Sequence, residues 1–178
     1  EDFGFYVIDM DKIGHKAHTL PEVKAEIAKQ FGSTMINPDG NVDRKKLGAA
    51  VFSDKKQLEK LNSLMRPFLL RLLNEDLELH KNENIIISAA LLFDAGLECF
   101  CEKIFIVRAS LWRIFIRGWK RDRHSPLRVH RILRSQKLKE YINQHAKTVD
   151  IVCINTNGTP NRLRKRLLKV LKNEGIKR

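Results

Sequence analysis

The sequence predicts an α/β domain built on a parallel β-sheet. Four short runs of aromatic and branched residues have the length and composition of strands: FYVID, NIIISAALLF, KIFIV and DIVCIN. The isoleucine triplet of the second run is typical of a strand buried on both faces. Amphipathic segments at helical spacing lie between the first two runs and after the last one, and such alternation is typical of a parallel sheet covered by helices.

The first long helical segment, LPEVKAEIAKQFG, has a proline and a glycine where helices begin and end. Pro21 fits the first turn, because an N–H there would have no partner, and Gly32 fits just past the end. The turn sequence NPDGNVD follows. From Asp43 to about His80, apolar and charged positions then alternate at helical spacing.

Two features are expected to divide this second helical stretch. Ser53 or Asp54 is the expected N-cap of a new helix, and Pro67 is expected to end or kink the helix near residues 65–66. The stretch is long for a simple crossover, so we expect a helical cap on one edge of the sheet. A last amphipathic helix, NRLRKRLLKVLKNEG, follows the fourth strand.

Charge is unevenly distributed along the chain, whose net charge is +13. Residues 1–107 contain 14 Lys and Arg against 17 Asp and Glu, whereas residues 108–178 contain 20 against 4. This asymmetry indicates one face that meets phosphate, on a nucleic acid or on a polyphosphate-bearing small molecule.

Other function classes find little support in the composition. No apolar run approaches the roughly 20 residues that span a bilayer, so no membrane partner is expected. Cys99, Cys101 and Cys153 lack the spacing of a zinc site and form an odd set, which argues against a disulfide framework. A reducing cytoplasm is the expected location.

Several segments follow one another in a recognisable order and spacing: VIDMDKIGHKA, FGSTMINPDGNVDRKKLGAAVF, LMRPFL, IIISAALLFDAGL, KIFIVRAS, RGWKRDR, RILRSQ and DIVCINTNG. Together they resemble the dephospho-coenzyme A kinase family over nearly the whole chain. The resemblance implies a P-loop kinase-like three-layer α/β/α fold with a parallel central sheet. It also implies a helical substrate-binding cap at about residues 19–82 and a basic lid at about residues 111–145, both within a single kinase domain.

The resemblance implies an enzyme that transfers the γ-phosphoryl group of ATP to the ribose 3′-hydroxyl of dephospho-coenzyme A, with Mg²⁺. Asp11 would be the base or orienting group for that hydroxyl, because a carboxylate at a strand end can accept the proton and hold the nucleophile in line. The alternative is that Asp11 only caps a helix that starts at Lys12. Asp9 points to the other face and is expected to be structural.

Four residues are expected to contact the acceptor substrate through the same resemblance. His15 is one, although a surface histidine is an equal alternative. Arg44 is expected to meet a substrate phosphate, or else to pair with Asp43 at a helix start. Leu92 and Phe93 would line the acceptor pocket, and plain core packing is their alternative.

Two further groups would bind phosphate and nucleotide. Arg117 and Arg121 are one helical turn apart and point to the same side; in the lid they would neutralise charge on the transferred phosphoryl group, and a solvated basic helix is the alternative. Asn155, Asn157 and Gly158 resemble the loop on the adenine side, where an ordinary turn is the alternative. The metal-ligand set stays unassigned.

The chain departs from the family pattern at several positions. Arg66 replaces a histidine, Ala90 a proline and Arg108 an aspartate. The phosphate-binding motif G-x-x-x-x-G-K-[ST] does not occur in these 178 residues. We therefore expect roughly 20 further residues upstream, the length of a strand, a loop and a helix.

Three rival functions stay open at this point. The first is another P-loop nucleotide or nucleoside kinase, and the second is a non-catalytic relative. The third is a nucleic-acid-binding module that uses the basic half of the chain and binds more weakly as salt rises. Nucleic acid is the less favoured partner, because the aromatic residues near the basic ones recur at helical spacing. A monomer or weak homo-oligomer is expected.

Overall fold

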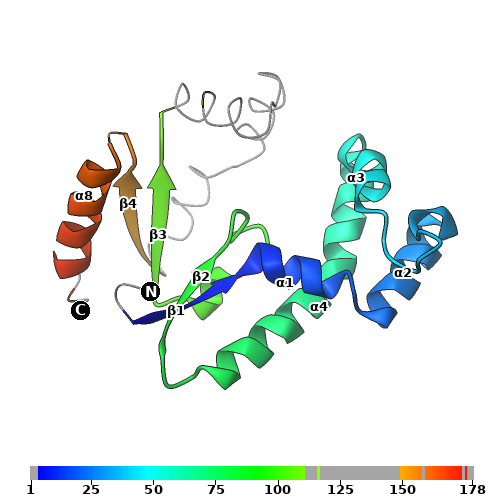
Figure 1. Cartoon of the computed structure of the whole chain (residues 1–178), viewed down its shortest axis with the longest axis horizontal. Coiled ribbons are helices and arrows are strands. Elements are labelled where there is room, and N and C mark those ends of the chain that lie inside the picture. The colour runs from blue at the N-terminus through cyan, green and yellow to red at the C-terminus, as the bar shows by residue number, and fades with distance from the viewer. Residues whose placement is uncertain (1–3, 111–115, 117–148, 158, 174, 176–178) are drawn as a thin grey trace. The chain divides into compact units, whose positions relative to one another are not determined.

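The computed structural model describes residues 4–110, 116, 149–157, 159–173 and 175 (Figure 1). The chain divides into two units, residues 1–90 and 91–178. Each unit is described by itself.

The first unit contains a pair of parallel strands, β1 (Phe5–Asp9) and β2 (Asn84–Ser88). Both strands were predicted from their branched residues, and the parallel pairing was predicted as well. The expected burial of the isoleucine triplet on both faces is wrong, because no residue of β2 is fully buried. Ile8 faces the core and is buried, while Val7 of β1 and Ile86 of β2 pair with each other and are 47% and 45% exposed. Asp9 is the last residue of β1, so the chain leaves the strand at a carboxylate.

Helices fill most of the chain between these two strands. They are α1 (Met10–Ala17), α2 (Pro21–Phe31), the short 3-10 helix η1 (Ser33–Met35), α3 (Arg44–Phe52) and α4 (Lys55–Leu79). Two predicted helix starts are confirmed: α2 has Pro21 in its first turn, and α4 is capped by Asp54. Gly32 ends α2 with φ +98° and ψ 147°, a backbone conformation that is essentially restricted to glycine.

The expected helix boundary at Pro67 is wrong, because α4 continues through it as one helix of 25 residues. Proline lacks the N–H of the helical hydrogen bond, which makes it costly inside a helix. Apolar side chains on both sides of it offset that loss: Leu64 and Met65 before the proline, and Leu72 and Leu73 after it, are buried. Tertiary packing along α4 therefore outweighs the local signal.

The core of the first unit forms around α4, which contacts α1, α2 and α3 (Figure 1). Besides the α4 residues it contains Ile8, Ile13, Ala17, Val23, Ile27, Leu47 and Val51. Because α1 follows β1 directly and packs on α4, this core fixes where the end of β1 lies.

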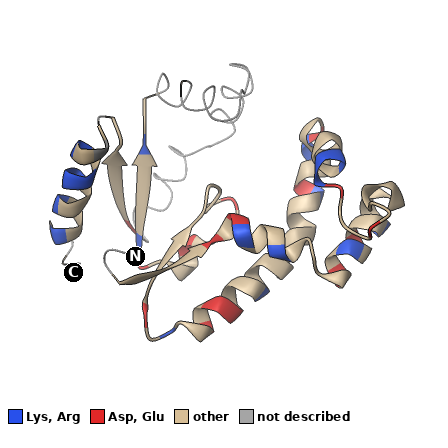
Figure 2. Ribbon diagram, in the orientation of Figure 1, with Lys and Arg blue, Asp and Glu red and all other residues tan. Residues whose placement is uncertain are grey.

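The second unit contains another parallel pair, β3 (Lys103–Arg108) and β4 (Asp150–Asn155), after the 3-10 helix η2 (Glu98–Phe100). Both strands were predicted. The Nζ of Lys103 lies 2.9 Å from a carboxylate oxygen of Asp150, which joins the starts of the two strands. The helix α8 (Pro160–Asn173) follows β4, contacts it, and carries basic side chains and no acidic ones (Figure 2).

Candidate functional site

Asp9 and Asp11 have different roles at the end of β1. The Oδ1 of Asp9 accepts hydrogen bonds from the backbone N–H groups of Asp11 (3.0 Å) and Lys12 (3.4 Å), so Asp9 is the N-cap of α1. The alternative in which Asp11 caps a helix starting at Lys12 is wrong. Asp11 lies in the first turn of α1 and is exposed. Its carboxylate makes no hydrogen bond or ion pair with another described residue.

His15 and Arg44 come from different helices, and both act on a third basic residue, His18. His15 is exposed and lies one helical turn after Asp11, on the same side of α1. His18 is the C-cap of α1. Burial, then the charge of Arg44 and then that of His15, hold the pKa of His18 below its ordinary value. The structure thus brings two of the expected acceptor contacts into one electrostatic environment.

His18 is a candidate site residue that the sequence reasoning missed. Its Nδ1 is buried and has no hydrogen-bond partner among the described residues. The signal that could have found it is the spacing of His15 and His18 in HKAH, three residues apart. The other expected partner of Arg44 is occupied differently: the Oδ1 of Asp43 accepts the N–H of Lys46 at 3.0 Å and caps α3.

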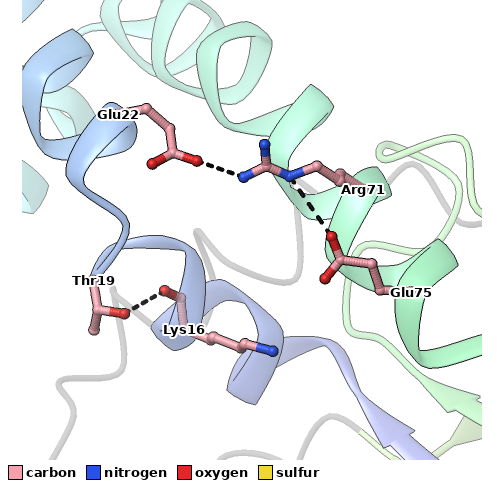
Figure 3. A network of polar contacts seen from close by, with 5 residues as sticks. All are labelled: Lys16, Thr19, Glu22, Arg71 and Glu75. Atoms are coloured by element: carbon pink, nitrogen blue, oxygen red, sulfur yellow. Dashed lines mark hydrogen bonds and ion pairs between the residues drawn. The ribbon is translucent and has the colours of Figure 1, made fainter. Parts of the chain in front are cut away.

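A polar network fastens α2 to α4 near the end of α1 (Figure 3). The Nη2 of Arg71 in α4 lies 2.6 Å from a carboxylate oxygen of Glu22 in α2, and its Nε lies 4.0 Å from Glu75. The hydrogen bond from Arg71 is the main cause that keeps the pKa of Glu22 below its ordinary value. The hydroxyl of Thr19 donates to the carbonyl of Lys16 at 2.8 Å, which stabilises the turn between α1 and α2.

A shallow cavity of about 300 Å³ lies beside β1, α1 and α4, and it contains none of the predicted site residues. Tyr6 is part of its wall. The Tyr6 hydroxyl donates to Asp76 at 3.2 Å, and its ring stacks on His80 with 3.5 Å between the centroids. Burial, and then Asp76, raise the pKa of Tyr6. Since these groups satisfy one another, we interpret them as a structural contact.

In the second unit, Leu92 and Phe93 lie in the turns that follow β2. The carbonyl of Leu92 accepts the N–H of Leu97 and that of Phe93 accepts the N–H of Gly96, both at 3.0 Å. Both side chains are half-buried, whereas Leu97 is fully buried. Leu92 and Phe93 are therefore not plain core residues, and their contact with the acceptor stays a prediction.

The loop after β4 is held to the end of β3 by a set of short hydrogen bonds. Thr156 donates its backbone N–H (2.7 Å) and its hydroxyl (3.1 Å) to the carbonyl of Arg108. The Oδ1 of Asn157 accepts the N–H of Ser110 at 2.8 Å, and the Oδ1 of Asn155 accepts the N–H of Asn157 at 2.8 Å. These contacts join the carboxyl ends of two parallel strands, where ligands of α/β proteins bind.

Other predicted features are tested only partly by the described residues. Gly158, Arg117 and Arg121 lie outside them. Within the described part of the chain, no group of three or more His, Cys, Asp or Glu side chains is placed to hold a metal ion. No helix among the described residues is long and apolar enough to cross a membrane.

Comparison with known families identifies the family of this chain. The model of the dephospho-CoA kinase family matches residues 1–161. The chain belongs to the dephospho-CoA kinase family. The predicted resemblance is thereby confirmed, and the match favours a kinase over a nucleic-acid-binding module.

Individual relatives agree with this family. A protein named dephospho-CoA kinase from Fusobacterium nucleatum is 33% identical over 162 residues, which are 91% of this chain and 82% of that protein. One from Borreliella burgdorferi is 40% identical over 108 residues, 61% of this chain and 52% of its own length.

Solved structures confirm the fold class. A crystal structure of a Thermus thermophilus protein has a TM-score of 0.75 and 26% identity over 97% of this chain and 86% of its own. The dephospho-CoA kinase of Campylobacter jejuni, at 24% identity, has a TM-score of 0.57 over the same shares of the two chains and shows the fold alone. The α/β, P-loop kinase-like fold predicted from the sequence is therefore confirmed.

The departures from the family pattern lie on the surface. Arg66 and Ala90 are both exposed. Arg108 is exposed too, and the loop after β4 bonds to its backbone carbonyl rather than to its side chain. The contacts of that loop are thus independent of the aspartate-to-arginine change.

Proposed function

We propose that this protein transfers the γ-phosphoryl group of ATP to the ribose 3′-hydroxyl of dephospho-coenzyme A, a step of coenzyme A biosynthesis. The match of the dephospho-CoA kinase family model to residues 1–161 carries this proposal. The strongly basic sequence from residue 108 onward supports it, because ATP and the pyrophosphate of the acceptor together present several negative charges.

Asp11 is the proposed catalytic residue. It lies just beyond the carboxyl end of β1, and its carboxylate has no competing partner among the described residues. In the reaction the 3′-oxygen of the ribose bonds to the γ-phosphorus while the bond from that phosphorus to the bridging oxygen breaks, and ADP leaves. Asp11 accepts the hydroxyl proton and holds the nucleophile in line.

His15 and Arg44 are the proposed contacts of the acceptor phosphates. The support is that Arg44 and His15 both act on His18, so positive charge collects near the end of the helix that carries Asp11. An acceptor pyrophosphate bound there would lower the cost of protonating His18. Leu92 and Phe93, half-buried and apolar, would contact the uncharged part of the acceptor.

Asn155, Asn157 and Gly158 are the proposed nucleotide contacts, and the loop that contains the two asparagines is bonded to the end of β3. Arg117 and Arg121 are proposed to close over the phosphates as part of a lid. Mg²⁺ commonly uses one or two carboxylates together with substrate phosphates. Asp11, whose carboxylate has no described partner, fits that pattern as a single ligand or as a nearby acceptor. We further propose a cytoplasmic monomer or weak homo-oligomer.

The test is an ADP-release assay on the full-length gene product, with dephospho-coenzyme A, nucleosides and nucleotides as competing acceptors. We expect ADP release with dephospho-coenzyme A and a product that carries one added phosphate on the ribose. ADP release only with a nucleoside or nucleotide would instead identify another P-loop kinase. A folded protein that releases no ADP with any acceptor would be a non-catalytic relative.

A further inference from the structure

The guanidinium group of Arg166 in α8 lies against the backbone of the loop that follows β4. Its Nη1 donates hydrogen bonds to the carbonyl of Asn155 at 3.1 Å and to that of Asn157 at 3.4 Å. One charged nitrogen therefore bridges two carbonyls that are two residues apart. Such charge-assisted hydrogen bonds are stronger than bonds between neutral groups, so they restrain the backbone between those carbonyls.

The same restraint extends to the side chains of the loop. The Oδ1 of Asn155 is occupied by the N–H of Asn157, and the Oδ1 of Asn157 by the N–H of Ser110. With both carbonyls bonded to Arg166, the side-chain groups of this loop without a described partner are the NH₂ groups of Asn155 and Asn157, and the backbone carbonyl of Thr156 has no described partner either. These NH₂ groups are hydrogen-bond donors, and they match the ring nitrogens and carbonyl-type oxygens of a base or the oxygens of a ribose.

We propose that Arg166 is a positioning residue for nucleotide binding. It holds the 155–157 loop so that the asparagine amides present their NH₂ groups, and it does not itself touch the nucleotide. The inference rests on the proposed function of this loop. A loop that is ordered before binding spares the nucleotide the entropy of ordering it. Removing Arg166 therefore weakens ATP binding more than it slows the chemical step.

Three substitutions in the full-length gene product test this role. Arg166→Ala removes both hydrogen bonds, and Arg166→Lys keeps a charged nitrogen that can reach one of the carbonyls. Lys169→Ala is the matched control, because Lys169 is exposed on the same helix and its loss changes the net charge by the same amount. The measurements are kcat, the KM for each substrate, calorimetric binding of ADP, and hydrogen exchange at the amide of Ser110.

For Arg166→Ala we expect the KM for ATP and the Kd for ADP to rise about 5- to 20-fold, the effect of having to order one or two loop side chains during binding. The kcat and the KM for dephospho-coenzyme A should stay within about twofold, as for an interaction that acts on binding. The Ser110 amide should exchange several-fold faster, because its acceptor Asn157 is less restrained. Arg166→Lys should recover part of each change, and Lys169→Ala should show none.

Several results would overturn the proposal. ADP affinity that is unchanged in Arg166→Ala is one. An equal loss in Lys169→Ala is another, since it would reduce the effect to net charge. Unaltered exchange at Ser110 would show that Arg166 does not restrain the loop. A wild-type protein that binds ADP but does not phosphorylate dephospho-coenzyme A would refute the proposed function. The role of Arg166 would still be tested by the Kd for ADP in the variants.

Discussion

Asp9 and Asp11 are two residues apart, and replacing each by alanine should affect different properties of the enzyme. In Asp9→Ala two backbone N–H groups lose their acceptor: that of Asp11, bonded at 3.0 Å, and that of Lys12, bonded more weakly at 3.4 Å. Loss of an N-cap costs about 1 kcal/mol, and loss of a negative charge at a helix start adds about 0.3–1 kcal/mol. The expected destabilisation is thus about 1–2 kcal/mol.

For a protein of this size each kcal/mol lowers Tm by roughly 2–4 °C, so Asp9→Ala should melt about 2–8 °C lower. Asp11→Ala breaks no described hydrogen bond and removes only the favourable charge of an exposed carboxylate in the first turn, which contributes about 0.3–1 kcal/mol. Its kcat, however, should fall by a factor of about 10²–10⁴, the usual contribution of a positioned general base.

The assay is calorimetric melting together with saturating kinetics at a temperature well below the lower Tm. Asp9→Asn is the matched control, because asparagine caps helices as well as aspartate does. It should restore most of the lost stability. If the folded Asp9→Ala and Asp9→Asn proteins both lost kcat as severely as Asp11→Ala, the assignment of a structural role to Asp9 and a chemical role to Asp11 would be refuted.

Two further predictions concern stability. Burial first, and the basic neighbours next, lower the pKa of His18 in the folded protein, so the unfolded chain binds a proton at this residue more readily. As pH falls below about 6.5, the Tm of the wild type should therefore fall more steeply than the Tm of His18→Gln. Parallel curves of Tm against pH would contradict the buried environment of His18. Gly32→Ala should lower the free energy of unfolding by about 1–3 kcal/mol, because of the backbone angles at this position rather than crowding. Gly14→Ala, in open space within α1, should raise it by about 0.5–1 kcal/mol. Chemical denaturation measures both, and equal changes in the free energy of unfolding would refute this reasoning.

Signals that act within a few residues of one another were readable from the sequence. Branched runs gave the strands, and Pro21, Gly32 and Asp54 marked where helices begin or end. Each of these acts through the conformation of its own backbone segment. The order of motifs along the chain was sufficient to identify the family.

Features that depend on contacts between distant segments were not predicted. The continuation of α4 through Pro67 depends on apolar packing along its whole length. Burial is the first cause of the lowered pKa of His18, and the charge of Arg44, 26 positions away, adds to it. The bond of Arg166 to the carbonyl of Asn155 spans a loop and part of a helix. Sequence spacing carries no information about contacts between distant segments, so candidate residues were found more readily than the residues that contact them.

The two strand pairs have a consequence for handling the protein in solution. Val7, Ile86 and Val107 lie on strands and are exposed, the last by 66%. Exposed branched side chains on strands favour contact between molecules. Light scattering should therefore accompany every kinetic and calorimetric measurement on the 178-residue chain, and association through these exposed side chains should rise with concentration.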